Sequence, residues 1–163
     1  MKTENSKATE EAVIRKLIED RTRAIRAKDI NLLMSNHAPD IVSFDVVDPL
    51  RYTGVHIMRE RAEKWFAFYE TAIGCEVRDL NIATGGDVAF CHYIYRVTGT
   101  GTDGVKVDMW VRTTVCLRKT GDTWLIVREH QSVPFNPEVA KHCLISSPNT
   151  SNTKARSDLF ASF

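Results

Sequence analysis

Two patterns of hydrophobic side chains divide this chain, and their order limits the fold more than any other feature of the sequence. Apolar residues recur at helical spacing up to Ala72, whereas four later segments alternate apolar and polar residues and are separated by turns. Helices followed by hairpins are typical of an α+β domain and do not fit alternating βαβ units. We therefore predict an α+β fold in which three N-terminal helices pack on a curved, mostly antiparallel sheet.

The first predicted helix runs from Thr9 to Ala27. Its apolar stripe consists of Ile14, Leu17, Ile18 and Ile25. Arg21 interrupts this stripe at spacings of four from Leu17 and Ile25, so its guanidinium should point toward the interior.

Two further helices follow. Asp29 is a suitable N-cap for a short second helix, which Pro39 should end. An amphipathic segment from Thr53 to Ala72 predicts the third helix, with Trp65 in its apolar stripe and Gly74 as its C-terminal cap.

The remaining regular segments are predicted as strands. Ile41–Val47 should place Ser43 and Asp45 on one face, because side chains alternate along a strand. Turn residues at Gly85-Gly86 and at Thr120-Gly121-Asp122 separate later strands and indicate hairpins. These later strands are predicted at Val77–Ala83, Val88–Thr98, Val105–Arg118 and Trp124–Val133.

Length and composition narrow the class of protein. The 163 residues fit one domain, which we place at residues 9–136, and the Ser-, Asn- and Thr-rich residues 137–163 are predicted to be a flexible tail. The 22 basic and 21 acidic residues leave a formal charge of +1, too balanced for a typical nucleic-acid binder. No apolar run is long enough to span a bilayer, and the first residues lack the features of a signal peptide. We therefore expect a cytoplasmic protein whose partners are neither nucleic acid nor membrane.

Cysteines and histidines give no sign of a cofactor or metal. The four cysteines form no CxxC pair and lie mostly in apolar, strand-like sequence, so we interpret Cys75, Cys91, Cys116 and Cys143 as reduced core thiols. Glu129 and His130 are neighbours on a strand and should point to opposite faces. No metal or cofactor is expected.

Polar side chains on two neighbouring strands are the candidates for a pocket wall. His92 and Arg96 share a face with Phe90, and Asp108, Trp110, Arg112 and Thr114 share a face of the next strand. Burying such a face without partners is costly, which favours a pocket or a polar interface. His130 joins this set unless a β-bulge before Pro134 reverses its face.

Structural roles are the alternative explanation for the same residues. His92 could be an ordinary strand histidine, and Trp110 could fill the core or an interface. Arg96 and Arg112 could pair with Asp108 or Glu129 across strands.

Three stretches carry a resemblance to a known superfamily. They are Ala24–Asp29, Ala38–Asp45 and the ending Trp124–Pro134. Together they resemble the nuclear transport factor 2-like superfamily, particularly its SnoaL-like and ketosteroid-isomerase-like branches, over roughly residues 10 to 135. The resemblance implies a cystatin-like cone in which sheet and helices enclose an apolar pocket, commonly in a homodimer.

The resemblance also suggests roles for individual residues. Asp45 falls where ketosteroid isomerase carries its catalytic base, Arg21 falls at its pocket tyrosine, and Thr114 aligns with the aspartate of its oxyanion hole. Val88–Thr98 resembles a strand of the calcium/calmodulin-dependent kinase II association domain, and Arg96 takes the position of a pocket arginine. Two other arginines of that pocket match Thr114 and Gln131.

Two functions follow from these residues. In the first, an isomerase or cyclase acts on an apolar carbonyl compound: Asp45 removes a proton, and Arg21, Arg112 or His92 stabilises the oxyanion. In the second, a non-catalytic binding or oligomerisation module holds a carboxylate. The ligand-binding candidates are Arg96, Arg112, Trp110, Asp108, His130 and Trp65.

Overall fold

The computed structural model describes residues 2–134, with side chains described from residue 7 onward. The predicted tail at residues 137–163 and Cys143 lie outside the described residues. The elements are α1 (Lys2–Ala27), α2 (Ile30–Met34), β1 (His37–Phe44), β2 (Tyr52–Thr53), α3 (Val55–Phe68), β3 (Gly74–Gly85), β4 (Val88–Thr100), β5 (Lys106–Thr120) and β6 (Thr123–Ser132).

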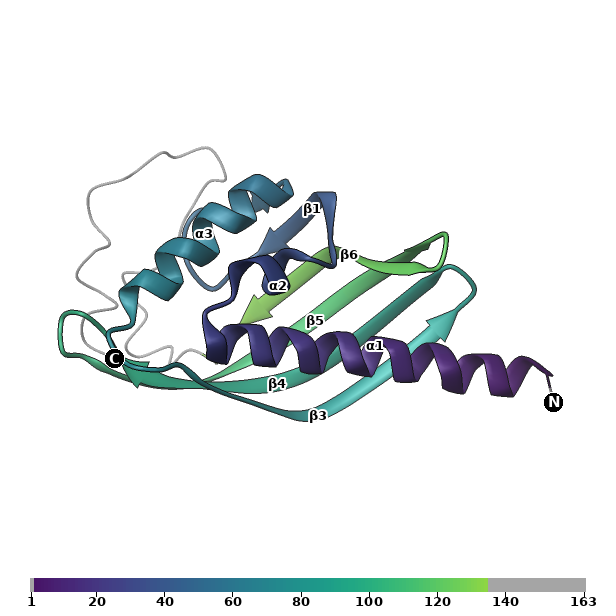
Figure 1. Ribbon diagram of the computed structural model, residues 1–163, viewed down its shortest axis with the longest axis horizontal. Coiled ribbons are helices and arrows are strands. Elements are labelled where there is room, and N and C mark those ends of the chain that lie inside the picture. Colours follow the sequence, from purple (N-terminus) through teal and green to yellow (C-terminus); the bar gives the residue numbers. More distant parts are fainter. Residues whose placement is uncertain (1, 135–163) are drawn as a thin grey trace.

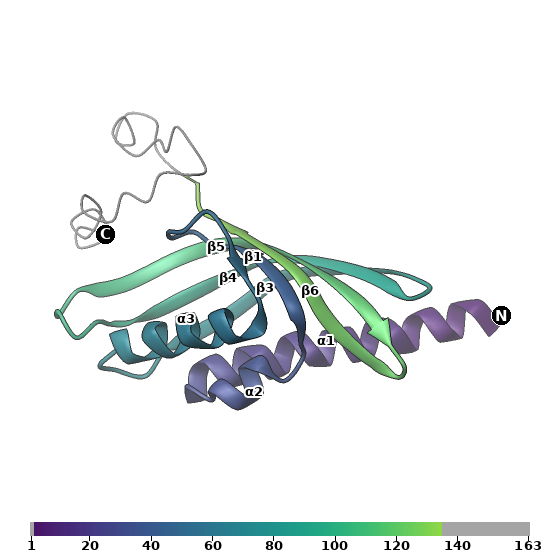
Figure 2. The ribbon, with the colours of Figure 1, turned by 90° about the horizontal axis from the view of Figure 1, so that it is seen from above.

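One six-stranded sheet, ordered β2-β1-β6-β5-β4-β3, forms the body of the fold. All neighbouring strands are antiparallel except β1 and β6, which run parallel. The sheet curves, and the three helices lie on one side of it (Figures 1 and 2). The predicted α+β class and cystatin-like arrangement are therefore confirmed.

The core lies between the helices and the inner face of the sheet. Ile14 and Ile18 of α1 are at most 1% exposed, as is Ile126 of β6. Trp124 is also buried, and its indole N–H donates to Glu10 on α1. The predicted inward stripe of the first helix is thus confirmed, although α1 begins earlier than Thr9.

The third helix is shorter than predicted. It ends at Phe68, because Tyr69 turns to an extended conformation and bridges to Gly101. The next backbone N–H groups, of Glu70 and Thr71, donate to Thr100 instead of continuing the helix. Gly74 is therefore not a helix cap: it begins β3, where a Cβ would collide with the Thr98 hydroxyl.

The first strand is shifted relative to its prediction. Pro39 lies inside β1 and does not end α2. The pairing of β1 with β6 is irregular between His37 and Val42, and this irregularity accommodates a proline that has no N–H for the ladder. Asp45 follows the last residue of β1, and Ser43 is fully buried within it.

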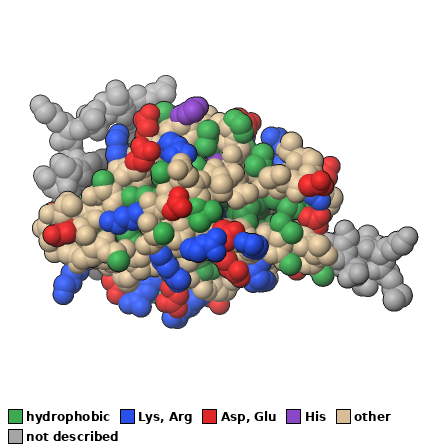
Figure 3. All heavy atoms as spheres, in the orientation of Figure 1, with side chains coloured by type: hydrophobic (Ala, Val, Ile, Leu, Met, Phe, Trp, Pro, Cys, Tyr) green, Lys and Arg blue, Asp and Glu red, His purple; other side chains and the backbone are tan. Residues whose placement is uncertain are grey.

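The structure also bears on the expectations about membrane spans, charge and cysteines. None of the helices in residues 2–134 is both long and apolar enough to cross a membrane. Acidic and basic side chains are intermixed on the face shown in Figure 3. Cys75 and Cys91 are buried free thiols as predicted, whereas Cys116 is only half-buried.

Candidate functional site

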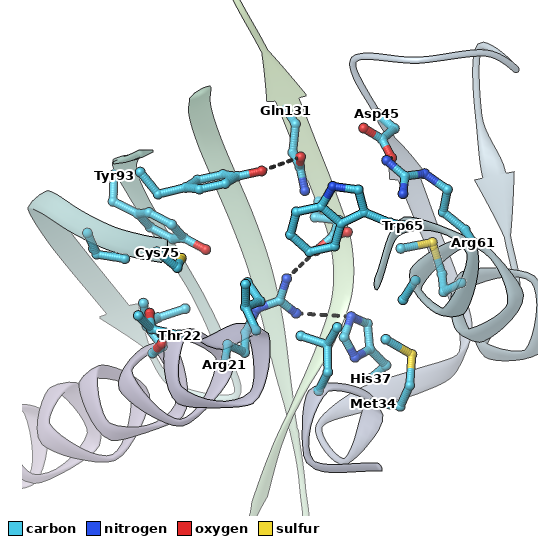
Figure 4. Close-up of a pocket in the computed structure, with 18 residues that line it drawn as sticks. Arg21, Thr22, Met34, His37, Asp45, Arg61, Trp65, Cys75, Tyr93 and Gln131 are labelled. Atoms are coloured by element: carbon cyan, nitrogen blue, oxygen red, sulfur yellow. Dashed lines mark hydrogen bonds and ion pairs between the residues drawn. The ribbon is translucent and has the colours of Figure 1, made fainter. Parts of the chain in front are cut away.

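A cavity of about 90 Å³ lies between the inner face of the sheet and helices α1 and α3. Its charged and amide-bearing lining consists of Arg21, His37, Asp45, Arg61, Glu129 and Gln131. Trp65, Tyr93 and Tyr95 add aromatic surface, and Figure 4 shows side chains from both layers directed into this space. An apolar protein cavity of about 150 Å³ holds one benzene molecule, so this cavity fits a smaller ligand.

Arg21 is at the centre of a buried polar network. One guanidinium nitrogen, Nη2, donates to Glu129 Oε2 at 3.0 Å, and the other, Nη1, lies 3.0 Å from His37 Nε2. Ser43 donates its hydroxyl to the second oxygen of Glu129 at 3.1 Å. The network ties α1 to strands β1 and β6, and it confirms that Arg21 points inward.

The network fixes the protonation of its members. Burial is the largest single influence on Glu129 and would raise its pKa, but the Arg21 charge, the neighbouring His37 and the hydrogen bonds from Ser43 and Arg21 together outweigh it, so the pKa is lowered and the carboxylate is ionised. Burial, together with the Arg21 charge, lowers the pKa of His37 to about 4. Because Arg21 can only donate, His37 Nε2 must accept, which places the proton of the neutral imidazole on Nδ1.

Asp45 forms the second ion pair of the cavity. Its Oδ2 lies 2.8 Å from Arg61 of α3, and its side chain is only 7% exposed. The other carboxylate oxygen accepts the Val46 backbone N–H. With neutral His37, the two cations Arg21 and Arg61 balance the two anions Glu129 and Asp45, so the cavity has no net charge.

Strands β4 and β6 supply the remaining polar wall. The Tyr95 hydroxyl donates to Gln131 Oε1 at 2.8 Å. Burial raises the pKa of Tyr93 and of Tyr95, which keeps both hydroxyls protonated. Burial also raises the pKa of the Cys75 thiol to about 11, which makes it a poor nucleophile at neutral pH.

The cavity contains no recognisable metal site. Within residues 2–134, no group of three or more His, Cys, Asp or Glu side chains is arranged to hold a metal ion.

Six residues that the sequence placed on the pocket wall lie instead on the outer face of the sheet. The inward residues of β4 include Ala89, Cys91, Tyr93 and Val97, which are buried, and Tyr95, which is half-buried. The predicted inner set, His92, Arg96, Asp108, Trp110, Arg112 and His130, faces away from the helices. Thr114 also faces outward, so it does not occupy an oxyanion-hole position. The prediction of this face was wrong because both faces of β4 carry aromatic and apolar side chains, so alternation alone could not choose between them.

The outer residues have partners or surroundings of their own. Arg96 binds Asp108 through two hydrogen bonds of 2.7 Å, which uses the guanidinium edge that a carboxylate ligand would need. His92, Arg112 and His130 line a separate surface hollow of about 330 Å³. Trp110 lies under the Arg78 guanidinium, 4.9 Å from its carbon to the ring centroid.

Of the predicted site residues, Asp45, Arg21 and Trp65 are those that the structure brings to one cavity. Four further lining residues had no predicted site role: His37, Arg61, Tyr95 and Glu129. A signal for Glu129 was available, because an arginine directed into a core requires an acidic partner.

Comparison with known proteins identifies the fold family. A family model described as a SnoaL-like domain matches residues 14–136. The chain belongs to the SnoaL-like family. A solved nuclear transport factor 2-like protein of unknown function from Pseudomonas putida KT2440 is 30% identical, with a TM-score of 0.74, covering 82% of this chain and 93% of that one. No curated protein matches this SnoaL-like chain.

Two more distant structures share the fold. A nuclear transport factor 2-like protein from Streptomyces avermitilis, described as a candidate dehydratase, is 18% identical with a TM-score of 0.71, covering 79% of this chain and 99% of that one. A candidate calcium/calmodulin-dependent kinase II association domain from Xanthomonas campestris is 20% identical with a TM-score of 0.64, covering 74% and 85% of the two chains. At these identities the likeness concerns the fold alone.

Proposed function

We propose that this SnoaL-like protein is a cofactor-independent acid–base catalyst that binds a small, neutral carbonyl compound in the cavity. The observation that carries the proposal is the placement of Asp45 and Arg21 on different walls of one small cavity, each with its charge balanced by a partner. In Figure 4 the two side chains face the same space from opposite sides, with Trp65 between them.

Asp45 would act as the base and Arg21 as the oxyanion stabiliser. The carboxylate of Asp45 takes a proton from the carbon next to the carbonyl, and the electrons of the broken C–H bond move to the carbonyl oxygen. Arg21 stabilises that developing negative charge in a site of low dielectric constant. In a conjugated enolate, return of the proton from Asp45 to another carbon completes an isomerisation. In a dicarbonyl compound, the enolate carbon attacks the second carbonyl carbon to form a ring, and the proton held by Asp45 passes to the resulting alkoxide.

The charge balance of the cavity favours this substrate class. A neutral ketone enters without adding charge, whereas a carboxylate would add an unbalanced anion to a site where Arg21 and Arg61 are already paired with Glu129 and Asp45. His92 has no part in this scheme, because its side chain is on the outer face. The carboxylate-binding alternative loses its principal residue, because Arg96 is paired with Asp108 outside the cavity.

Deuterium uptake by a simple ketone tests the proposal. Acetone is incubated with the protein in deuterated buffer at neutral pD, and loss of its methyl proton signal is followed by NMR. The wild type should exchange these protons above the buffer rate, and Asp45→Asn should reduce the protein-dependent rate by at least about 100-fold, within the usual range for general base catalysis.

Asp108→Asn is the matched control, because it makes the same chemical change on an exposed outer-face carboxylate. It should exchange acetone at the wild-type rate. Equal exchange by wild type and Asp45→Asn would overturn the proposal, as would exchange no faster than in buffer.

We also propose that the protein is a homodimer paired through the outer face of the sheet. That face exposes Phe44, Val88, Phe90 and Trp110, each at least 36% exposed. It also carries side chains of both charges, so two copies related by a twofold axis can offer opposite charges to each other. Sedimentation should give a dimer that Phe90→Glu converts to a monomer, whereas a monomeric wild type would refute the pairing.

A further inference from the structure

We propose that Gln131 is a second hydrogen-bond donor to the ligand oxygen and that Tyr95 is the residue that positions it. The inference deepens the proposed function and rests on it, because it concerns the same cavity and the same carbonyl oxygen. It extends the recognition of the ligand from one side chain to two.

The hydrogen bond from Tyr95 decides which end of the Gln131 amide is free. The protonated phenol donates to Oε1 at 2.8 Å, so the amide oxygen is engaged on the β4 side. The Nε2 group is then left with two N–H donors, and no hydrogen bond within residues 2–134 uses them. Gln131 lines the cavity and is half-buried, and Figure 4 shows its amide between the strand tyrosines and Trp65.

Arg21 has donors to spare in the same cavity. Each terminal guanidinium nitrogen carries two N–H groups, and the contacts to His37 and Glu129 use one on each nitrogen. A carbonyl oxygen has two lone pairs and accepts two hydrogen bonds. Arg21 and Gln131 therefore each have a donor available to a carbonyl oxygen in the cavity that they both line, and in the proposed complex Asp45 would face the carbon next to that oxygen.

This pair of donors defines the ligand class more closely. A ketone or an amide offers an acceptor oxygen and no charge, and it satisfies both donors. A carboxylate offers acceptors as well, but its charge must leave water for a cavity whose own charges are already paired and leave no net positive charge to offset that cost. We expect selection for small, neutral carbonyl compounds over carboxylates of the same size.

Acetone, acetamide and acetate provide matched probes, because they have the same number of heavy atoms and nearly the same shape. Their binding is measured by chemical-shift titration of the wild type and its variants. Acetone and acetamide should bind the wild type at least about fivefold more tightly than acetate does. Gln131→Leu should weaken the binding of acetone by about fivefold, because one neutral hydrogen bond usually contributes that much to an affinity. Asp108→Asn should bind acetone as the wild type does.

A double-mutant cycle separates positioning from a structural role of Tyr95. Alone, Tyr95→Phe should weaken the binding of acetone about fivefold. When it is added to Gln131→Leu, the further loss of affinity should be no more than about twofold, because the amide that Tyr95 orients is then absent. Independent losses in the double variant would refute the positioning role. Gln131→Asn, which keeps an amide of shorter reach, should also weaken acetone and serves in place of Gln131→Leu if that variant does not fold.

The outcomes distinguish this inference from the proposed function. Wild-type affinity in Gln131→Leu or Gln131→Asn overturns the role of Gln131, even if deuterium exchange still depends on Asp45. Exchange that persists in Asp45→Asn overturns the catalytic proposal, while a loss of acetone binding in the Gln131 variants still supports the two-donor site. Failure of acetone and acetamide to bind the wild type overturns the inference.

Discussion

The neutral, buried His37 should make the protein less stable in mildly acidic solution. In the unfolded chain this imidazole has a pKa of 6.5, whereas burial and the Arg21 charge lower it to about 4 in the folded protein. Between these pH values the unfolded chain binds more protons, so acidification favours unfolding. The contribution of neutral His37 to the free energy of unfolding is therefore fully present above pH 6.5 and is lost progressively as the pH falls toward 4.

The size of this effect follows from the two pKa values. Between pH 7 and pH 5 the His37 contribution removes about 2 kcal/mol from the free energy of unfolding. The lowered pKa of Glu129 acts in the same direction at more acidic pH. Full protonation of both groups would place a second cation beside Arg21 and remove its acidic partner.

Urea unfolding followed by tryptophan fluorescence measures this loss. His37→Gln supplies an acceptor for Arg21 without an ionisable ring, so its stability should fall by about 2 kcal/mol less than that of the wild type between pH 7 and pH 5. His56→Gln, which removes an exposed histidine of α3, is the control and should follow the wild type. An equal loss in His37→Gln and wild type would refute the assignment of a neutral, acid-sensitive imidazole.

Three other substitutions test the packing and the division between inner and outer faces. Glu129→Gln keeps the side-chain volume but leaves the buried Arg21 cation without its acidic partner. Urea unfolding should show a free energy of unfolding lower by about 3 kcal/mol or more, and a loss under about 1 kcal/mol contradicts a buried ion pair. Gly99→Ala should lower the melting temperature, because the added Cβ would lie 2.6 Å from a Tyr69 ring carbon, and an unchanged thermal transition would show that this contact relaxes freely. Arg96→Ala should leave acetone affinity unchanged in the chemical-shift titration, and a weaker affinity would show that the outer face influences the cavity.

The sequence contains enough information to predict the architecture because its hairpins are clearly marked. The glycine-rich turns at Gly85-Gly86 and near Gly121 separate long alternating segments, and β3 to β6 lie close to their predicted positions. The bounds of α3 and β1 could not be predicted, because long-range pairing decides them. Pro39 sits in a strand only because the β1–β6 pairing is irregular there, and α3 ends where Tyr69 meets Gly101.

A single irregularity in β6 explains part of the error in the site. Trp124 and Ile126 face the core, and the register shift at Val127 then turns Glu129 and Gln131 inward and His130 outward. Strict alternation from Trp124 would direct His130 inward, so the sequence could show only that a bulge would reverse its face. The inward direction of the Arg21 side chain could be predicted, because α1 has no irregularity that shifts the helical spacing of its apolar residues.

The parallel pairing of β1 with β6 has a consequence for how the chain is made. Arg21 and its acidic partner Glu129 are 108 positions apart, and Ser43 and Glu129 are 86 positions apart. Synthesis proceeds from the N-terminus, so α1, α2 and β1 leave the ribosome long before the strand that satisfies their polar groups. Contacts between such distant positions also form slowly. A nascent chain that lacks β6 therefore contains the sequence of all three helices but has no complete cavity, because Glu129 and Gln131 are still missing, and the cavity is completed only when this strand inserts beside β1.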